Sequence, residues 1–192
     1  MSDGFAQIYL DKRYADYSFS FLHGYFYCSG LSIENPFSGI IWRLTEDGRI
    51  AMPLELVINH IATEREITFQ WWFSDSEDLY CRFRFLEQTV CIEFYLDGLE
   101  EEQKDIVCNA CIALLRLLIS LNVGIGLVVD RRGYSVELDW DSIFLRQHQF
   151  PVNMPLPDIL AFSKSSNCFD NIRDDYEFIE EYQGFCFIAN PD

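Results

Sequence analysis

Residues 106–129 constrain the fold most, because they are almost continuously apolar over about the length of a membrane-spanning helix. Arg116 lies near the middle of this run, where an arginine costs about 2.5 kcal/mol or more in lipid. Gly124 and Gly126 interrupt the run near its end. A buried helix that ends near Asn122, followed by a buried strand, explains the same residues. We therefore expect no membrane span.

Two main helices are predicted. The longer one covers residues 99–121, where three consecutive glutamates from Glu100 place negative charge at the positive end of the helix dipole. Its later turns are apolar on nearly every side, which predicts a buried helix. The shorter one covers residues 53–63, since Pro53 suits a first helical turn and apolar residues recur at helical spacing.

Strands are predicted where aromatic and β-branched residues alternate with polar ones. These segments are residues 17–28, 37–45, 66–73, 79–86, 89–96 and 125–129. Residues 134–138 are expected to form a hairpin with 125–129, and residues 176–188 a strand pair around Gln183 and Gly184. A short helix is expected within 139–149, whereas prolines interrupt 150–157.

The arrangement of these elements indicates an α+β fold, because strands follow one another between two main helices. Short connections within residues 66–96 favour antiparallel pairing. Arg82 and Arg84 alternate with apolar residues, which predicts one apolar and one charged sheet face. We expect a single globular domain over residues 1–192, with a mostly antiparallel sheet packed on two main helices.

The seven cysteines are interpreted as reduced, mostly buried thiols, because free cysteine packs as a small hydrophobic residue. Their number is odd, and the N-terminus lacks the basic and apolar regions of a secretory signal. These features favour a cytoplasmic protein. Cys108 and Cys111 have CxxC spacing, but their apolar helical surroundings favour packing over a redox or zinc site.

Motifs for cofactor chemistry are missing from the sequence. There is no phosphate-binding P-loop and no GxSxG motif, and Gly124-Ile-Gly126 lacks the third glycine of a dinucleotide loop. We therefore expect no cofactor. Asp139 and Asp141 could hold a divalent cation in a carboxylate-dependent enzyme, which remains an alternative. The other interpretation of these two residues is a solvated turn or a helix cap.

The charge balance points to a different kind of partner. The 31 acidic residues against 14 basic ones give a net charge of −17, which argues against direct nucleic-acid binding. The acidic aromatic segment, residues 168–192, carries seven carboxylates and one arginine. Carboxylates beside aromatic residues suit a basic protein partner. The candidate partner-binding residues are Asp170, Asp174, Asp175, Tyr176, Glu177, Glu180, Glu181 and Tyr182.

The sequence thus favours a non-catalytic acidic inhibitor of a basic protein, comparable to an immunity protein that blocks a toxin nuclease. A nucleic-acid mimic that occupies a DNA- or RNA-binding factor fits the same charge. A carboxylate-dependent enzyme and a subunit of a larger assembly are the alternatives. If the aromatic residues of the acidic aromatic segment point inward, its acidic residues form only the solvated side of an edge strand. The Arg82 and Arg84 sheet face or the Trp71-Trp72 region is then the next candidate surface.

Overall fold

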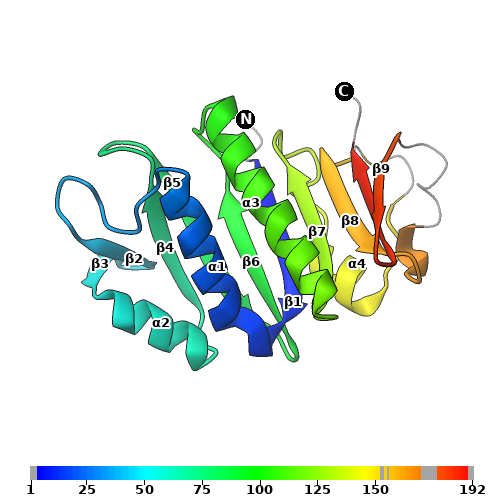
Figure 1. The fold of residues 1–192 in the computed structure, drawn as a ribbon, viewed down its shortest axis with the longest axis horizontal. Helices are drawn as coiled ribbons and strands as arrows, with labels where there is room; N and C mark the ends of the chain where they lie inside the picture. Colours follow the sequence, from blue (N-terminus) through cyan, green and yellow to red (C-terminus); the bar gives the residue numbers. More distant parts are fainter. Residues whose placement is uncertain (1–3, 152–153, 155, 170–176, 190–192) are drawn as a thin grey trace.

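The computed structural model describes residues 4–151, 154, 156–169 and 177–189. These residues form one ten-stranded antiparallel sheet in the order β3-β2-β4-β5-β6-β1-β7-β8-β10-β9 (Figure 1). The predicted α+β class is confirmed. The strands are β1 (Phe5–Asp11), β2 (Ile41–Thr45), β3 (Gly48–Met52), β4 (Ile67–Trp72), β5 (Asp78–Phe85), β6 (Thr89–Tyr95), β7 (Gly124–Asp130), β8 (Ile159–Ser163), β9 (Glu177–Tyr182) and β10 (Phe185–Ala189).

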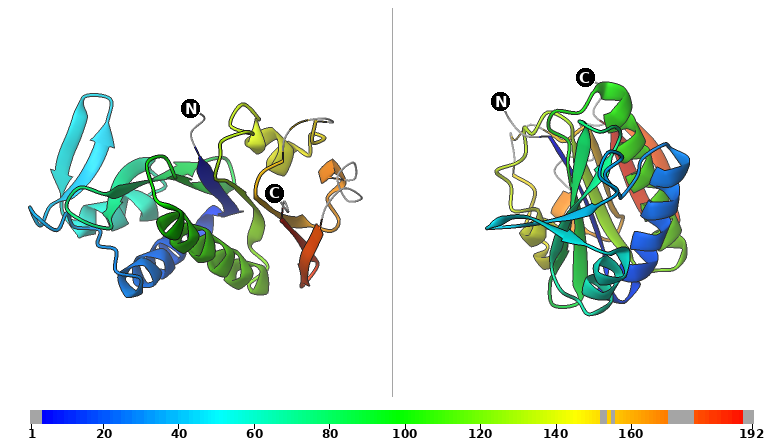
Figure 2. Two further views of the ribbon diagram at one scale, coloured as in Figure 1. Left: turned by 90° about the horizontal axis from the view of Figure 1, so that it is seen from above. Right: turned by 90° about the vertical axis from the view of Figure 1, so that its left-hand side faces the viewer.

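Helices lie on both sides of this sheet. The helices α1 (Ala15–Cys28), α2 (Leu54–Ala62) and α3 (Glu101–Ser120) cover one face, which we call the helix face. The short α4 (Trp140–Arg146) and its flanking segments cover part of the other face (Figure 2). Two clusters of buried residues result, a large one under α1 to α3 and a smaller one under α4.

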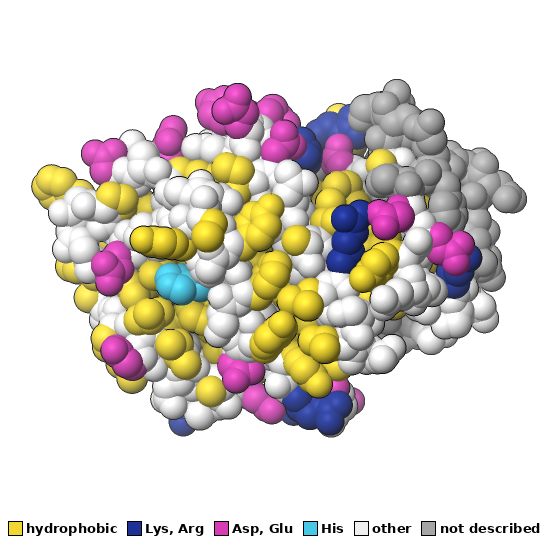
Figure 3. Space-filling model, viewed as in Figure 1, with side chains coloured by type: hydrophobic (Ala, Val, Ile, Leu, Met, Phe, Trp, Pro, Cys, Tyr) yellow, Lys and Arg dark blue, Asp and Glu magenta, His cyan; other side chains and the backbone are white. Residues whose placement is uncertain are grey.

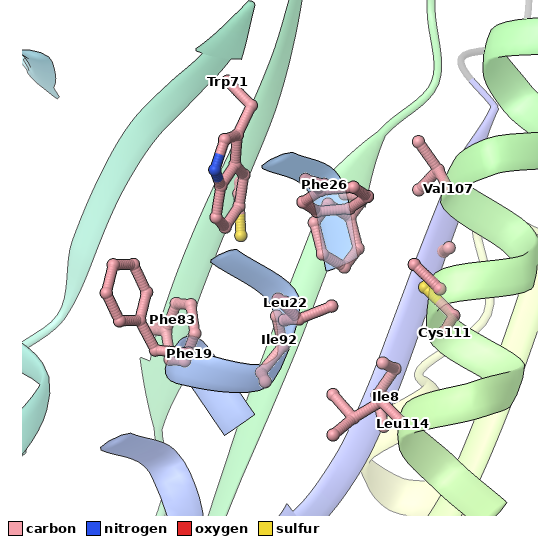
Figure 4. Packing of buried hydrophobic residues seen from close by; sticks show 14 of the residues in the cluster. Ile8, Phe19, Leu22, Phe26, Trp71, Phe83, Ile92, Val107, Cys111 and Leu114 are labelled. Carbon is pink, nitrogen blue, oxygen red and sulfur yellow. The ribbon is translucent and has the colours of Figure 1, made fainter. Parts of the chain in front are cut away.

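The predicted long buried helix is confirmed as α3. Its N-terminus is capped by the side chain of Gln103, which accepts a hydrogen bond from the backbone N–H of Glu100 at 2.9 Å. Leu114 (Figure 4) is fully buried in the large cluster, and so is Leu118. In the part of the chain that the structure describes, no helix is long and apolar enough to cross a membrane.

The strand predicted at residues 17–28 is wrong, because these residues belong to α1. Phe19, Leu22 and Phe26 recur at helical spacing and are buried against the sheet (Figure 4). Ser18 and Ser20, which suggested a polar strand face, instead donate hydrogen bonds to carbonyls four residues earlier. Burial of the apolar residues that recur every three or four positions thus favours a helix, although the alternating pattern favours a strand.

The strand predicted at residues 134–138 is also wrong, because these residues form turns. The carboxylate of Asp130 accepts hydrogen bonds from the backbone N–H and the hydroxyl of Ser135, at 2.6 and 2.7 Å. β7 pairs with β1 on one side and β8 on the other, so no edge remains for a hairpin partner. Neither β1 nor β8 is among the predicted strands.

The remaining predicted elements are confirmed with small shifts. Residues 53–63 contain α2, residues 66–96 contain the antiparallel strands β4 to β6, and residues 139–149 contain α4. The strand predicted at 37–45 is β2 alone, which continues through a turn into β3. The strand pair predicted at 176–188 is present as β9 and β10.

The predicted burial of most cysteines is confirmed. All seven thiols are free, and six of them are buried, with Cys28 as the exposed exception. Burial raises the pKa of Cys108 to about 11. Cys108 and Cys111 therefore pack inside the large cluster as neutral thiols, as their apolar helical surroundings predict.

Gly126 explains how α4 reaches the sheet. A Cβ atom at this position would lie 2.1 Å from the Phe144 ring, closer than any packed side chain tolerates. The missing side chain lets Phe144 lie against β7, where its ring also packs 4.8 Å from that of Tyr9. The glycine that resembled part of a dinucleotide loop thus serves packing, and it positions α4 beside the charged sheet face.

Candidate partner-binding face

A part of the sheet opposite the helix face carries no helix. It extends over β2, β4, β5 and β6, between the β2–β3 hairpin on one side and the α4 segment on the other (Figure 2). The hairpin bends away from the sheet because β2 pairs with β4 through only two residue pairs. We call this surface the open face, and its side chains are Trp42, Leu44, Arg49, Thr68, Trp72, Tyr80, Arg82 and Tyr95.

The open face is hollowed at three places. The first hollow, of about 710 Å³, is lined by Trp42, Trp72 and Arg49 together with Asn35, Phe37, Ser38, Asp75, Ser76 and Asp78. The second and third, of about 460 and 260 Å³, share Arg82 and Tyr95. The surface is therefore concave and rich in aromatic and arginine side chains, the residue types that contribute most to binding at protein interfaces.

The first hollow, here called the tryptophan hollow, is built by a loop docked on β4. Ser32 and Trp72 exchange two backbone hydrogen bonds, at 3.0 and 2.7 Å, and these fix the loop to the strand. The side chain of Asn35 accepts hydrogen bonds from the backbone of Phe37 and Ser38, at 3.2 and 2.9 Å. This turn presents the Phe37 ring at the rim of the hollow, where it is 87% exposed.

Two polar groups around the tryptophan hollow are notable. Arg49 donates a hydrogen bond to the Tyr80 hydroxyl at 3.0 Å, which holds the guanidinium against the sheet. Trp72 is only 5% exposed, and its indole N–H has no hydrogen-bond partner among the described residues. A buried N–H without an acceptor is uncommon in folded proteins and marks a place where an acceptor is missing.

The charged sheet face predicted from Arg82 and Arg84 is confirmed. Arg84 of β5 donates a hydrogen bond to Glu93 of β6 at 2.8 Å and another to Asp141 of α4 at 2.9 Å. Arg82 reaches Glu66 at 2.7 Å and Glu93 at 3.6 Å. Glu93 is only 8% exposed, so this network is a mostly buried one that joins α4 to the sheet.

Tyr9 completes the network from β1. Its hydroxyl donates a hydrogen bond to Asp141 at 2.8 Å. Burial, together with the nearby Cys91 and Asp141, raises the pKa of Tyr9, so it stays protonated as a donor. Burial alone would raise the pKa of Asp141, but hydrogen bonds from Arg84 and Tyr9 bring it below its usual value.

Asp139 and Asp141 do not form a pair of free ligands. Asp139 caps α4 by accepting hydrogen bonds from the backbone N–H and the hydroxyl of Ser142, at 3.0 and 2.6 Å, and these bonds lower its pKa. Asp141 is already paired with Arg84. Within the described ranges, no group of three histidine, cysteine, aspartate or glutamate residues is placed to hold a metal ion. The helix-cap interpretation of Asp139 is confirmed.

The acidic aromatic segment is only partly covered by the structure. Asp170, Asp174, Asp175 and Tyr176 lie outside the described residues, and Glu177 is described only through its backbone in β9. Glu180 forms an ion pair with Arg116, and Glu181 forms one with Lys164. Tyr182 packs against the large cluster. The described carboxylates of β9 thus have partners within the chain.

The Arg82 and Arg84 sheet face and the Trp71-Trp72 region are secondary candidate surfaces in the sequence, which does not show that they join in one aromatic open face. Neighbouring Trp71 and Trp72 point to opposite sides of β4. Trp71 lies in the large cluster (Figure 4), and Trp72 lines the tryptophan hollow on the open face. Strand alternation could have placed Trp72, Tyr80 and Arg82 on one face, since β4 and β5 pair antiparallel.

Comparison with protein-family models, curated proteins and solved structures finds no match to this chain.

Proposed function

We propose that this protein is a non-catalytic, cytoplasmic inhibitor that binds a basic protein through the open face. The observation that carries the proposal is the concave surface that gathers Trp42, Trp72, Tyr80, Tyr95 and Arg82. Tryptophan, tyrosine and arginine dominate the energetics of protein interfaces, because they bury large areas and still offer hydrogen bonds.

The charge of the chain supports a basic partner. Glu46 and Glu66 line the second hollow, and Asp75 and Asp78 line the tryptophan hollow, so carboxylates accompany the aromatic surface. Other carboxylates gather elsewhere, such as at the N-terminal end of α3 (Figure 3). A net charge of −17 would speed association with a basic toxin or nucleic-acid-binding factor. In this proposal the acidic aromatic segment contributes steering charge rather than the central contact.

The buried network favours this proposal over the carboxylate-dependent enzyme. Glu93 and Asp141 are both occupied by arginines, and Tyr9 is held as a donor to Asp141. A general acid or base needs a group that is free to exchange its proton with a substrate. These residues instead fasten α4 beside the open face, which suits a rigid binding surface.

The test is affinity capture from the native host with wild-type and variant protein. Wild-type protein is expected to retain one basic protein in stoichiometric amount. The charge-neutral double variant Trp42→Ala with Tyr95→Ala is expected to weaken that binding by about thirtyfold or more, because it removes interface anchors.

Two further variants act as controls in the same experiment. Tyr17→Ala with Leu56→Ala removes two exposed hydrophobic side chains from α1 and α2 of the helix face, where Figure 3 also shows hydrophobic residues, and should leave binding unchanged. Glu180→Gln with Glu181→Gln should slow association only modestly. The proposed surface would be refuted if the helix-face double variant failed to capture the partner while the open-face double variant still captured it.

A further inference from the structure

The tryptophan hollow has the composition of a site for a cation. We propose that it receives an arginine or lysine side chain of the basic partner. This inference rests on the proposed function and names the group that the partner inserts. Trp42 and Trp72 line the hollow, and Phe37 stands at its rim. A cation over an aromatic face is attracted by the ring electrons, and tryptophan is the strongest of these rings.

The charges that line the hollow favour a cation over an anion. Asp75 and Asp78 stand there against the single cation Arg49. Neither carboxylate has an ion pair among the described residues, whereas Arg49 is held by the Tyr80 hydroxyl. Within the described part of the chain, the side chain of Asp78 accepts its hydrogen bond from the neutral amide of Gln70. Two carboxylates without a cationic partner leave room for an incoming guanidinium or ammonium group.

The charge of the chain favours a basic partner protein as the carrier of that cation. A second copy of this chain is a poor occupant, because two molecules of net charge −17 repel each other.

The experiment measures binding of a short peptide of alternating arginine and glycine by titration calorimetry. The comparison peptide carries citrulline in place of arginine, which keeps the shape and removes the charge. We expect the arginine peptide to bind and the citrulline peptide to bind about tenfold or more weaker. Trp42→Phe should reduce the change in tryptophan fluorescence that accompanies binding, and Trp72 accounts for the remainder.

Two double variants distinguish binding in the hollow from the general attraction between a cationic peptide and an acidic protein. Asp75→Asn with Asp78→Asn should weaken binding of the arginine peptide by about tenfold or more. Glu55→Gln with Glu102→Gln removes the same charge from α2 and α3 on the helix face, and should change binding by less than about twofold. Thermal melting of each variant shows whether the fold is intact.

Three results would overturn this inference: no binding of the arginine peptide, equal binding of the citrulline peptide, or equal weakening by both variant pairs. These results are distinguishable from failure of the proposed function. If the peptide fails while partner capture still requires Trp42 and Tyr95, the open face remains the binding surface and the cation site is wrong. If no basic partner is captured at all, the proposed function itself is wrong.

Discussion

Replacing Leu114 by alanine is expected to lower the free energy of unfolding by about 2–5 kcal/mol, the range for emptying a packed core position. Leu114 is fully buried and extends from α3 toward β1, where Ile8 lies (Figure 4). The helix and the central strands share one cluster, so the cavity would form at the centre of the molecule.

Urea denaturation followed by circular dichroism measures this change. Asn109→Ala is the control, because Asn109 is an exposed position of the same helix. Its effect should be only a few tenths of a kcal/mol, about that of helix propensity. Equal stability of the two variants would mean that α3 is peripheral to the core.

Replacing Arg84 by methionine is expected to cost about 3–5 kcal/mol, because removal of one partner leaves the other charges buried and uncompensated. Arg84 bridges Glu93 and Asp141, and all three side chains are largely shielded from water. Arg13→Met is the matched control, since Arg13 forms a comparable but exposed pair with Asp11. Because water screens that surface pair, the Arg13 variant should unfold at nearly the same urea concentration as the wild type.

The pH dependence of stability tests the contribution of Asp141 to the same network. The pKa of Asp141 is lowered in the folded protein, so its ionised form stabilises the fold. This contribution is present above the unfolded pKa of 3.8 and is lost as the pH falls through the lower folded value. In Arg84→Met the loss should shift to higher pH. If the free energy of unfolding falls at the same acidic pH in Arg84→Met as in the wild type, Asp141 and Arg84 are not coupled.

The sequence predicted the fold best where one pattern dominates a segment. The apolar run of α3, the amphipathic spacing of α2 and the short connections of β4 to β6 each lead to one structure. The failure at α1 has a physical cause, since Phe19 fits both a two-residue and a helical period and only tertiary packing decides between them. The turn at Ser135 depends on Asp130, whose buried carboxylate replaces the hydrogen bonds of a hairpin.

The candidate surface was predictable only in part. The alternation of Arg82 and Arg84 correctly gave a charged sheet face, but it did not show that α4 covers Arg84 and leaves Arg82 accessible. The tryptophan hollow gathers residues from two loops, a hairpin and two strands, so no local pattern reveals it. Its residues are distant in sequence and meet only because β2 pairs with β4.

The central claim is that a basic protein binds the open face, and site-specific photo-crosslinking in the native host tests it most directly. A photoreactive phenylalanine analogue replaces Tyr95 on the open face, which is 40% exposed, or Tyr17 on the helix face, which is 43% exposed. The proposal predicts one crosslinked basic partner from position 95 and none from position 17. A partner crosslinked from position 17 alone, or an acidic partner crosslinked from position 95, would contradict it.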